Sequence, residues 1–138
     1  FGSAVELMKL KHGIFDEASV SVINLATIAA IGREVGDELD IRRFRANIII
    51  ATDATEAFQE DGWIGSRLVF GNHDVGPMIN VAMRDPRCVM INLDPDTARQ
   101  DPRIMKAAVR LNNNDAGAYA NVARTGQLTV GQAVNLIT

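Results

Sequence analysis

The chain contains one cysteine, Cys88, and its setting in the sequence predicts a reactive thiol. Arg87 precedes it directly and Arg84 lies four residues back, so positive charge would favour the thiolate form. A thiolate is the form that ligates soft metals or carries sulfur. The alternative is that Cys88 behaves as a small buried hydrophobic residue, as many free cysteines do.

A second candidate is the segment 43–47, which reads Arg-Phe-Arg-Ala-Asn. We expect a strand over Arg43–Thr52, in which successive side chains point to opposite faces. Arg43, Arg45 and Asn47 would then point together, away from the core. Guanidinium groups suit phosphate oxygens, and an amide can read the edge of a heterocycle. A solvated strand face is the alternative interpretation.

The same alternation applies to a predicted strand over Cys88–Asp94. Val89, Ile91 and Leu93 would form its apolar face, which places Cys88 on the opposite face. The two segments together predict a pocket in which a thiol meets basic and amide groups.

The remaining titratable residues are weaker candidates. His12 and His73 have no helical i, i+4 partner and no ligand cluster nearby, so the sequence does not predict a zinc site. Glu60 and Asp61 could act as an acid–base pair, although adjacent carboxylates in a turn are more often solvated. No phosphate-loop or nucleophile-elbow motif occurs.

Apolar spacing and turn residues predict the elements that must position these side chains. Asn24 is expected to cap a helix over 25–35, which ends before Gly36. A second helix is expected around Ile104–Leu111 and ends at the asparagines 112–114. The other predicted strands are Val20–Val22, Arg67–Gly71, Ile79–Asp85, Tyr119–Arg124 and Gln132–Ile137, with a turn at Asp61-Gly62. This pattern predicts a strand-dominated α+β fold.

Composition excludes several classes of protein. The 138 residues suit a single domain, and a net charge of -3 without a basic run argues against a nucleic-acid partner. No stretch approaches the roughly 20 apolar residues that a membrane helix requires. Without a signal peptide or a second cysteine for a disulfide, the expected compartment is the cytoplasm.

Five short motifs occur here in the same order as in the MOSC family, named after the C-terminal domain of molybdenum cofactor sulfurase. Each motif is weak alone, but their order is specific, and the resemblance runs over about residues 20–138. The motifs are Arg43–Asn47, Glu60–Trp63, Arg87-Cys88, Asp94–Thr97 and the closing Gly126–Gly131; Tyr119 also fits the family pattern.

The resemblance implies a MOSC-type β-barrel with a few short helices and a cleft for molybdenum cofactor (molybdopterin). In the family, the cysteine is either the molybdenum ligand or a sulfur carrier, which implies one of these roles for Cys88. The arginine and asparagine of the first motif contact the cofactor, and the positions of Arg87 and Tyr119 lie close to it. The implied cofactor-binding set is Arg43, Arg45, Asn47, Arg87 and Tyr119.

The sequence departs from the family pattern at several positions. Ala46 replaces a proline, which would loosen the strand, and Pro86 replaces a small polar residue, which would remove a hydrogen bond to the cofactor. Ala98 replaces a glycine, which changes the turn that contains it. The chain begins with Phe1, so we expect one MOSC domain over 1–138, separated from the N-terminal β-domain of related enzymes.

The resemblance implies two functions of different classes. One is a molybdenum enzyme, similar to amidoxime-reducing proteins, that reduces N-hydroxylated small molecules with electrons from a ferredoxin-like or flavin donor. The other is a sulfur-carrier module that bears a persulfide on Cys88. A non-catalytic binding domain is the third alternative. None of the three implies a nucleic-acid or membrane partner.

Overall fold

The structure is a computed structural model that describes residues 17–52 and 55–138. This part of the chain contains six strands, two α-helices and three short 3-10 helices. The strands are β1 (Val20–Asn24), β2 (Ile48–Ile50), β3 (Arg67–Phe70), β4 (Met78–Pro86), β5 (Asp115–Arg124) and β6 (Val134–Ile137). The helices are α1 (Leu25–Val35), α2 (Pro102–Asn112), η1 (Ile41–Phe44), η2 (Gln59–Trp63) and η3 (Val89–Asn92).

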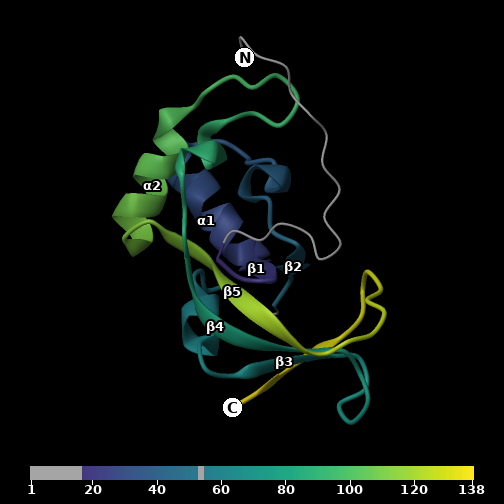
Figure 1. The fold of residues 1–138 in the computed structure, drawn as a ribbon. Helices are drawn as coiled ribbons and strands as arrows, with labels where there is room; N and C mark the ends of the chain where they lie inside the picture. Colours follow the sequence, from purple (N-terminus) through teal and green to yellow (C-terminus); the bar gives the residue numbers. More distant parts are fainter. Residues whose placement is uncertain (1–16, 53–54) are drawn as a thin grey trace.

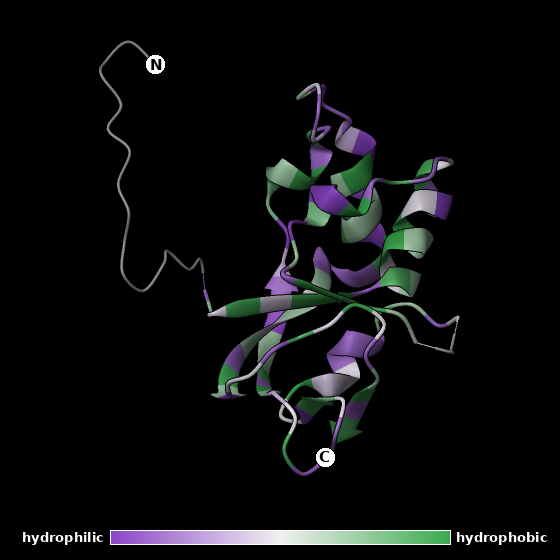
Figure 2. Ribbon diagram, turned by 90° about the vertical axis from the view of Figure 1, so that its right-hand side faces the viewer, coloured by the Kyte–Doolittle hydropathy of each residue, from purple (hydrophilic) through white to green (hydrophobic). Residues whose placement is uncertain are grey.

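The strands form one sheet in the order β2-β1-β5-β4-β3-β6. β1 and β2 are parallel, and every other neighbouring pair is antiparallel. The sheet curls into a half-barrel, with both α-helices at one end and β3 and the C-terminus at the other (Figures 1 and 2). The strand-dominated α+β class expected from the sequence is therefore confirmed.

Two hydrophobic clusters hold the sheet and the helices together. One fills the half-barrel and contains Val22, Trp63, Leu68 and Val81. The other lies between the helices and the sheet and contains Ile23, Ile28, Phe44, Ile91 and Ile104. Successive residues of β1, Val22 and Ile23, enter different clusters because side chains alternate along a strand. β1 is thus buried on both faces and fixes the helices on the sheet.

Helix α1 agrees with the sequence prediction at both ends. The Asn24 side chain accepts a hydrogen bond from Ala26 N at 3.1 Å, which satisfies a free amide of the first turn. Gly36 ends the helix in the left-handed conformation, where a glycine has no Cβ to clash. No helix in the described residues is long and apolar enough to cross a membrane.

Two predicted strands are wrong, and both lie next to the candidate site. Within the segment 43–52, only Ile48–Ile50 is a strand; Arg43 and Phe44 end η1, and residues 45–47 belong to neither element. The segment 88–94 contains η3 instead of a strand. Val89 is 63% exposed whereas Ile91 is fully buried, so these two residues do not share an apolar face.

Candidate functional site

A cavity of about 590 Å³ lies where β1, η1, the end of β4 and β5 meet. Its walls include five of the six site residues predicted from the sequence: Arg45, Asn47, Arg87, Cys88 and Tyr119. The other wall residues are Ala18, Ser19, Ser21, Phe44, Asp85, Pro86 and Met90. The cavity is therefore assembled from segments that are far apart in the sequence.

Arg45 reaches the cavity because a short 3-10 turn ends directly before it. The Asp40 side chain caps this turn by accepting from Arg42 N at 2.8 Å, and buried Phe44 anchors it in the core. Arg45 then adopts a left-handed conformation with φ 52°. Its exposed guanidinium makes no hydrogen bond or ion pair with any residue that the structure describes. It is therefore a cation available to a ligand.

Asn47 is fixed by its contacts with Ser21 on the neighbouring β1. Its Oδ1 accepts from Ser21 N at 2.9 Å and from Ser21 Oγ at 3.1 Å, and its own N–H donates to Ser21 O at 3.0 Å. These bonds extend the β1–β2 pairing by one residue and commit Oδ1 to the protein. The Nδ2 group has no partner among the described residues, so it remains free to donate to a ligand.

Cys88 lies between β4 and η3, directly before the first residue of η3. Its side chain is exposed, which excludes the alternative of a buried hydrophobic cysteine. The two neighbouring arginines are both paired with carboxylates. Arg84 Nη2 lies 3.3 Å from Asp61 Oδ2, and the Arg87 guanidinium pairs with Asp85. The positive charge that the sequence placed beside Cys88 is thus largely neutralised within the protein.

Tyr119 enters the cavity wall from β5. It lies opposite Ser21 of β1 and Met83 of β4 in the sheet register, and 8% of it is exposed. The ring therefore forms part of a rigid wall. Ser21 connects Tyr119 to Asn47, since one strand position contacts both.

Arg43 lies outside this cavity. Its Nη1 donates to Asn92 O at 3.1 Å, and its Nη2 pairs with Asp94 Oδ2 at 3.1 Å. The predicted shared face of Arg43 and Arg45 fails because η1 and the left-handed Arg45 replace the expected strand, so the side chains no longer alternate as in extended backbone. The role predicted for Arg43 in cofactor binding has no support from its position.

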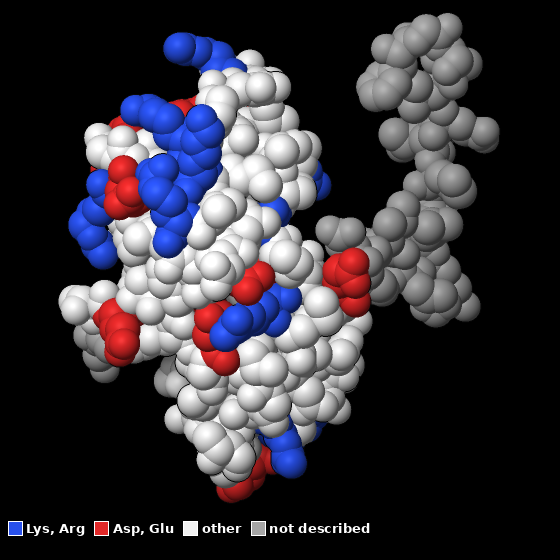
Figure 3. Space-filling model, turned by 90° about the vertical axis from the view of Figure 1, so that its left-hand side faces the viewer, with Lys and Arg blue, Asp and Glu red and all other residues white. Residues whose placement is uncertain are grey.

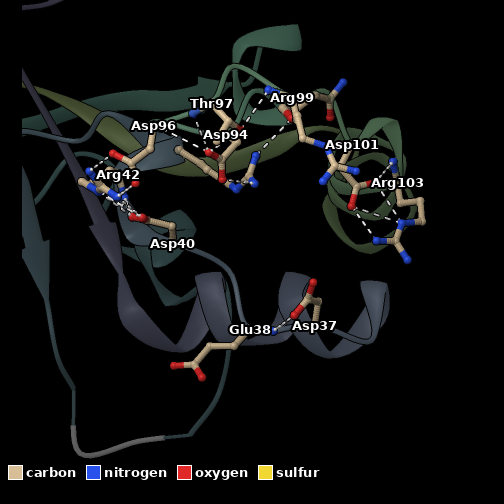
Figure 4. Close-up of polar contacts among 12 residues, drawn as sticks. Asp37, Glu38, Asp40, Arg42, Asp94, Asp96, Thr97, Arg99, Asp101 and Arg103 are labelled. Atoms are coloured by element: carbon tan, nitrogen blue, oxygen red, sulfur yellow. Dashed lines mark hydrogen bonds and ion pairs between the residues drawn. The ribbon is translucent and has the colours of Figure 1, made fainter.

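Ion pairs join η1 to the loop that follows η3. Arg42 donates to Asp40 at 2.6 Å and to Asp96 at 2.7 Å (Figure 4). Hydrogen bonds from Arg42 hold the pKa values of both carboxyl groups below their usual range. Asp94 accepts from the hydroxyl and the N–H of Thr97, and these bonds lower its pKa as well. This network fixes the turn from which Arg45 projects.

Glu60 is fully buried and does not reach the cavity. Its carboxylate accepts from Asn24 N at 3.3 Å and from Thr27 Oγ1 at 2.9 Å. Burial raises the pKa of Glu60, and these hydrogen bonds only partly oppose the effect. Of the two alternatives left open by the sequence, an acid–base pair or solvated carboxylates in a turn, the solvated one is wrong for Glu60. Glu60 instead links η2 to the start of α1.

The described residues contain no group of three or more His, Cys, Asp or Glu that could hold a metal ion. His73 is exposed beside Asp74, and His12 lies outside the described part. Figure 3 shows basic and acidic side chains mixed on the face that carries α2. There, Arg103 pairs with Asp101 and Arg110 with Glu34. These arginines are thus neutralised by neighbouring acids.

Sequence reasoning missed three polar wall residues, Ser19, Ser21 and Asp85. Ser21 is the polar residue between two valines of β1, so strand alternation could have placed it on the face opposite Val20 and Val22. Asp85 lies two residues before Arg87 in an extended segment, a spacing that puts both side chains on one side. This signal was present in the sequence.

Known proteins share both the sequence pattern and the fold of this chain. A model of the MOSC domain matches residues 9–135. Mitochondrial amidoxime reducing component 2 of Bos taurus is 28% identical over 132 residues, which cover 86% of this chain and 37% of that protein. Mitochondrial amidoxime-reducing component 1 of Danio rerio is 27% identical, and the match covers 89% and 38%.

A solved structure shows the same fold. The crystal structure of the YUAD protein from Bacillus subtilis matches with a TM-score of 0.66 and 18% identity, over 89% of this chain and 65% of that chain. The present chain spans less than two fifths of the length of the amidoxime-reducing relatives. Because the family model covers nearly all of its residues, the chain belongs to the MOSC domain family.

Proposed function

We propose that this chain is the cofactor-binding domain of a molybdenum-dependent reductase of N-hydroxylated compounds, with Cys88 as the molybdenum ligand. The observation that carries the proposal is the placement of an exposed thiol and an unpaired guanidinium in one cavity. The names of the amidoxime-reducing relatives support the class of reaction.

The residues of the cavity fit a pterin-bound metal by the chemistry of their donors. Cys88 offers a thiolate, the kind of ligand that soft metals prefer. Arg45 offers an uncompensated planar cation for phosphate oxygens, and Asn47 Nδ2 offers a donor for a heterocycle edge. The cofactor, when bound, would supply a redox centre that accepts the oxygen atom of the substrate.

The protein's own residues would bind and orient the reactants. Arg45 and Asn47 would hold the anionic and heterocyclic parts of the cofactor, while the β1–β5 pairing keeps Tyr119 and Ser21 in place. Pro86 and Met90 form an apolar part of the wall that would exclude water. In the overall reaction the substrate N–O bond breaks, two electrons and two protons enter, and the oxygen leaves as water. The electrons would come from a ferredoxin-like or flavin protein.

Elemental analysis of the protein purified from its native host tests the proposal. We expect molybdenum in near-equal amount to protein, loss of the metal in Cys88→Ser, and reduction of an N-hydroxylated amidine by the wild type with a chemical electron donor. A fully folded native protein that contains no molybdenum would contradict the proposal. The predicted cytoplasmic location is tested separately by cell fractionation, since the named relatives are mitochondrial.

A sulfur-carrier role is the second candidate, favoured by the exposure of Cys88. In that role the Cys88 thiolate takes the outer sulfur of a donor persulfide, and the donor leaves as a thiol. Intact mass measurement after incubation with a persulfide donor should then show one added sulfur, removable by reductant. A non-catalytic binding domain would show bound cofactor with neither reduction nor sulfur transfer.

A further inference from the structure

The guanidinium of Arg87 is enclosed by protein, although Arg87 lines the cavity. Its side chain is only 10% exposed. Nη1 donates to Asp85 Oδ2, and Nη2 donates to the carbonyl oxygen of Phe44. The Phe44 ring also lies 5.8 Å from the guanidinium carbon. Both terminal nitrogens thus already serve protein acceptors.

The main chain of Arg87 is held on its other side by Asn114. Arg87 N donates to Asn114 O at 2.9 Å, and Asn114 Nδ2 donates to Arg87 O at 2.6 Å. Because Cys88 is the next residue, these bonds fix the peptide from which the thiol projects. The side chain of Arg87 therefore contacts β4 and η1, whereas its backbone contacts the turn between α2 and β5.

The carbonyl oxygen of Phe44 belongs to the peptide bond that joins Phe44 to Arg45. The hydrogen bond from Arg87 therefore acts directly on the backbone of Arg45. A left-handed conformation such as that of Arg45 is unfavourable for a residue with a side chain and persists where its surroundings fix it. The capping bonds of Asp40 fix the start of this turn, and Arg87 fixes its end. A single side chain therefore connects the backbone of Arg45 to the segment of Cys88.

From this arrangement we infer that Arg87, with Asp85 and Asn114, is a positioning group. It fixes the backbone at Arg45 and at Cys88, and so sets the position of one side chain relative to the other in the cavity. Asp85 is 4% exposed in its side chain and neutralises Arg87, so Arg45 is the cation without a carboxylate partner among the described wall residues. The inference reassigns Arg87, which the family resemblance places among the cofactor contacts. The role of this arrangement in catalysis rests on the proposed function, but the experiment that tests the arrangement does not.

The thiol of Cys88 provides a direct probe, because it is the chain's only cysteine. We would measure its rate of reaction with dithiobis-nitrobenzoate, an anionic disulfide, and with dithiodipyridine, a neutral one. Both reagents react with the same thiolate, so the ratio of the two rates cancels the thiolate fraction. The ratio then reports the positive charge beside the sulfur.

Arg87→Lys keeps the charge but lacks the planar fork that joins Asp85 to Phe44 O. We expect it to lower the ratio of the rate with the anionic reagent to the rate with the neutral reagent by roughly 3- to 10-fold, because the Arg45 cation would no longer be held beside the sulfur. Arg45→Gln should give a similar fall, and the double variant should fall no further. Arg110→Lys, at a surface ion pair on α2, is the matched control and should keep the wild-type ratio.

Asn114→Gly serves if Arg87→Lys does not fold, because glycine accepts the left-handed φ of 77° and removes only the side-chain bond. We expect it to lower the ratio as well, by less than Arg87→Lys. A folded Arg87→Lys with the wild-type ratio would overturn the inference, as would an Arg45→Gln variant without effect. Absence of molybdenum from the native protein would instead contradict the proposed function, and it would not affect the result of the thiol-rate assay.

Discussion

Arg45 and Cys88 line the same cavity from two segments that are both 3-10 turns rather than strands. Each residue occupies an end of its turn: Arg45 directly follows η1, and Cys88 directly precedes η3. Residues at such ends can project into a cavity while the hydrophobic residues inside the turn, Phe44 and Ile91, stay buried. The turns thus combine anchoring in the core with exposure of the reactive group.

Arg45→Gln is expected to weaken cofactor binding without unfolding the protein. A charge-assisted hydrogen bond contributes about 1.5–3 kcal/mol, which corresponds to a roughly 10- to 100-fold lower affinity. The molybdenum content of the native protein after gel filtration measures this effect. Arg67→Gln changes an exposed arginine on β3, far from the cavity, and should retain the metal. Equal retention by both variants would remove Arg45 from the binding site.

The sequence predicted which residues lie at the site better than it predicted the secondary structure that brings them there. Helix α1, with its Asn24 cap and Gly36 end, was predictable because capping and apolar spacing are local signals. The segments 43–47 and 88–94 were not, because alternating apolar residues also fit a 3-10 turn that is anchored in a core. Asp40, two residues before Arg42, was the local signal that a capped turn begins there.

The resemblance placed Arg45, Asn47 and Cys88 together even though the strand argument for doing so was wrong. A family motif carries information about which distant segments pack together. The local spacing of apolar residues carries no such information. The pairing of Arg87 with Asp85 and Phe44 O, by contrast, depends on contacts between distant segments. Neither spacing nor motif could have revealed that the acceptor of this guanidinium is a main-chain carbonyl.

Glu60 should make the protein less stable as the pH rises. Burial raises its pKa in the folded state above the ordinary value of 4.5, so the folded protein keeps the proton to a higher pH than the unfolded chain. The stabilisation present below the unfolded pKa is lost as the pH rises through the folded pKa. Urea unfolding between about pH 4 and about pH 8 measures this slope.

Glu60→Gln should flatten that slope, because the amide cannot ionise. Glu56→Gln, at an exposed glutamate before the same turn, should keep the wild-type slope. A Glu60→Gln protein whose stability still falls with rising pH by the wild-type amount would show that another group is responsible.

Asp40 and Asp96 should make the turn before Arg45 sensitive to acid. Hydrogen bonds from Arg42 lower both pKa values in the folded state, so their stabilisation is complete above the unfolded pKa and is lost as the pH falls through the folded values. Asp96→Asn should make the acid-induced loss of stability smaller. High salt should reduce the difference in acid-induced loss of stability between the wild type and Asp96→Asn, because these side chains are exposed. Acid titrations followed by circular dichroism at low and high salt check both expectations.

Ala98→Gly should stabilise the protein by about 0.5–1 kcal/mol. Ala98 stands where the family usually has glycine, and it adopts a left-handed conformation with φ 58° in which its N–H donates to Asp94 O at 2.9 Å. A Cβ in this conformation costs about 1 kcal/mol or more, and glycine removes that cost, although the more flexible unfolded chain offsets part of the gain. Ala29→Gly in α1 is the matched control, since its exposed helical position has no such strain and should lose roughly 1 kcal/mol. Urea unfolding of the two variants compares them directly, and a loss of stability in both would mean that the turn at Ala98 carries no conformational strain.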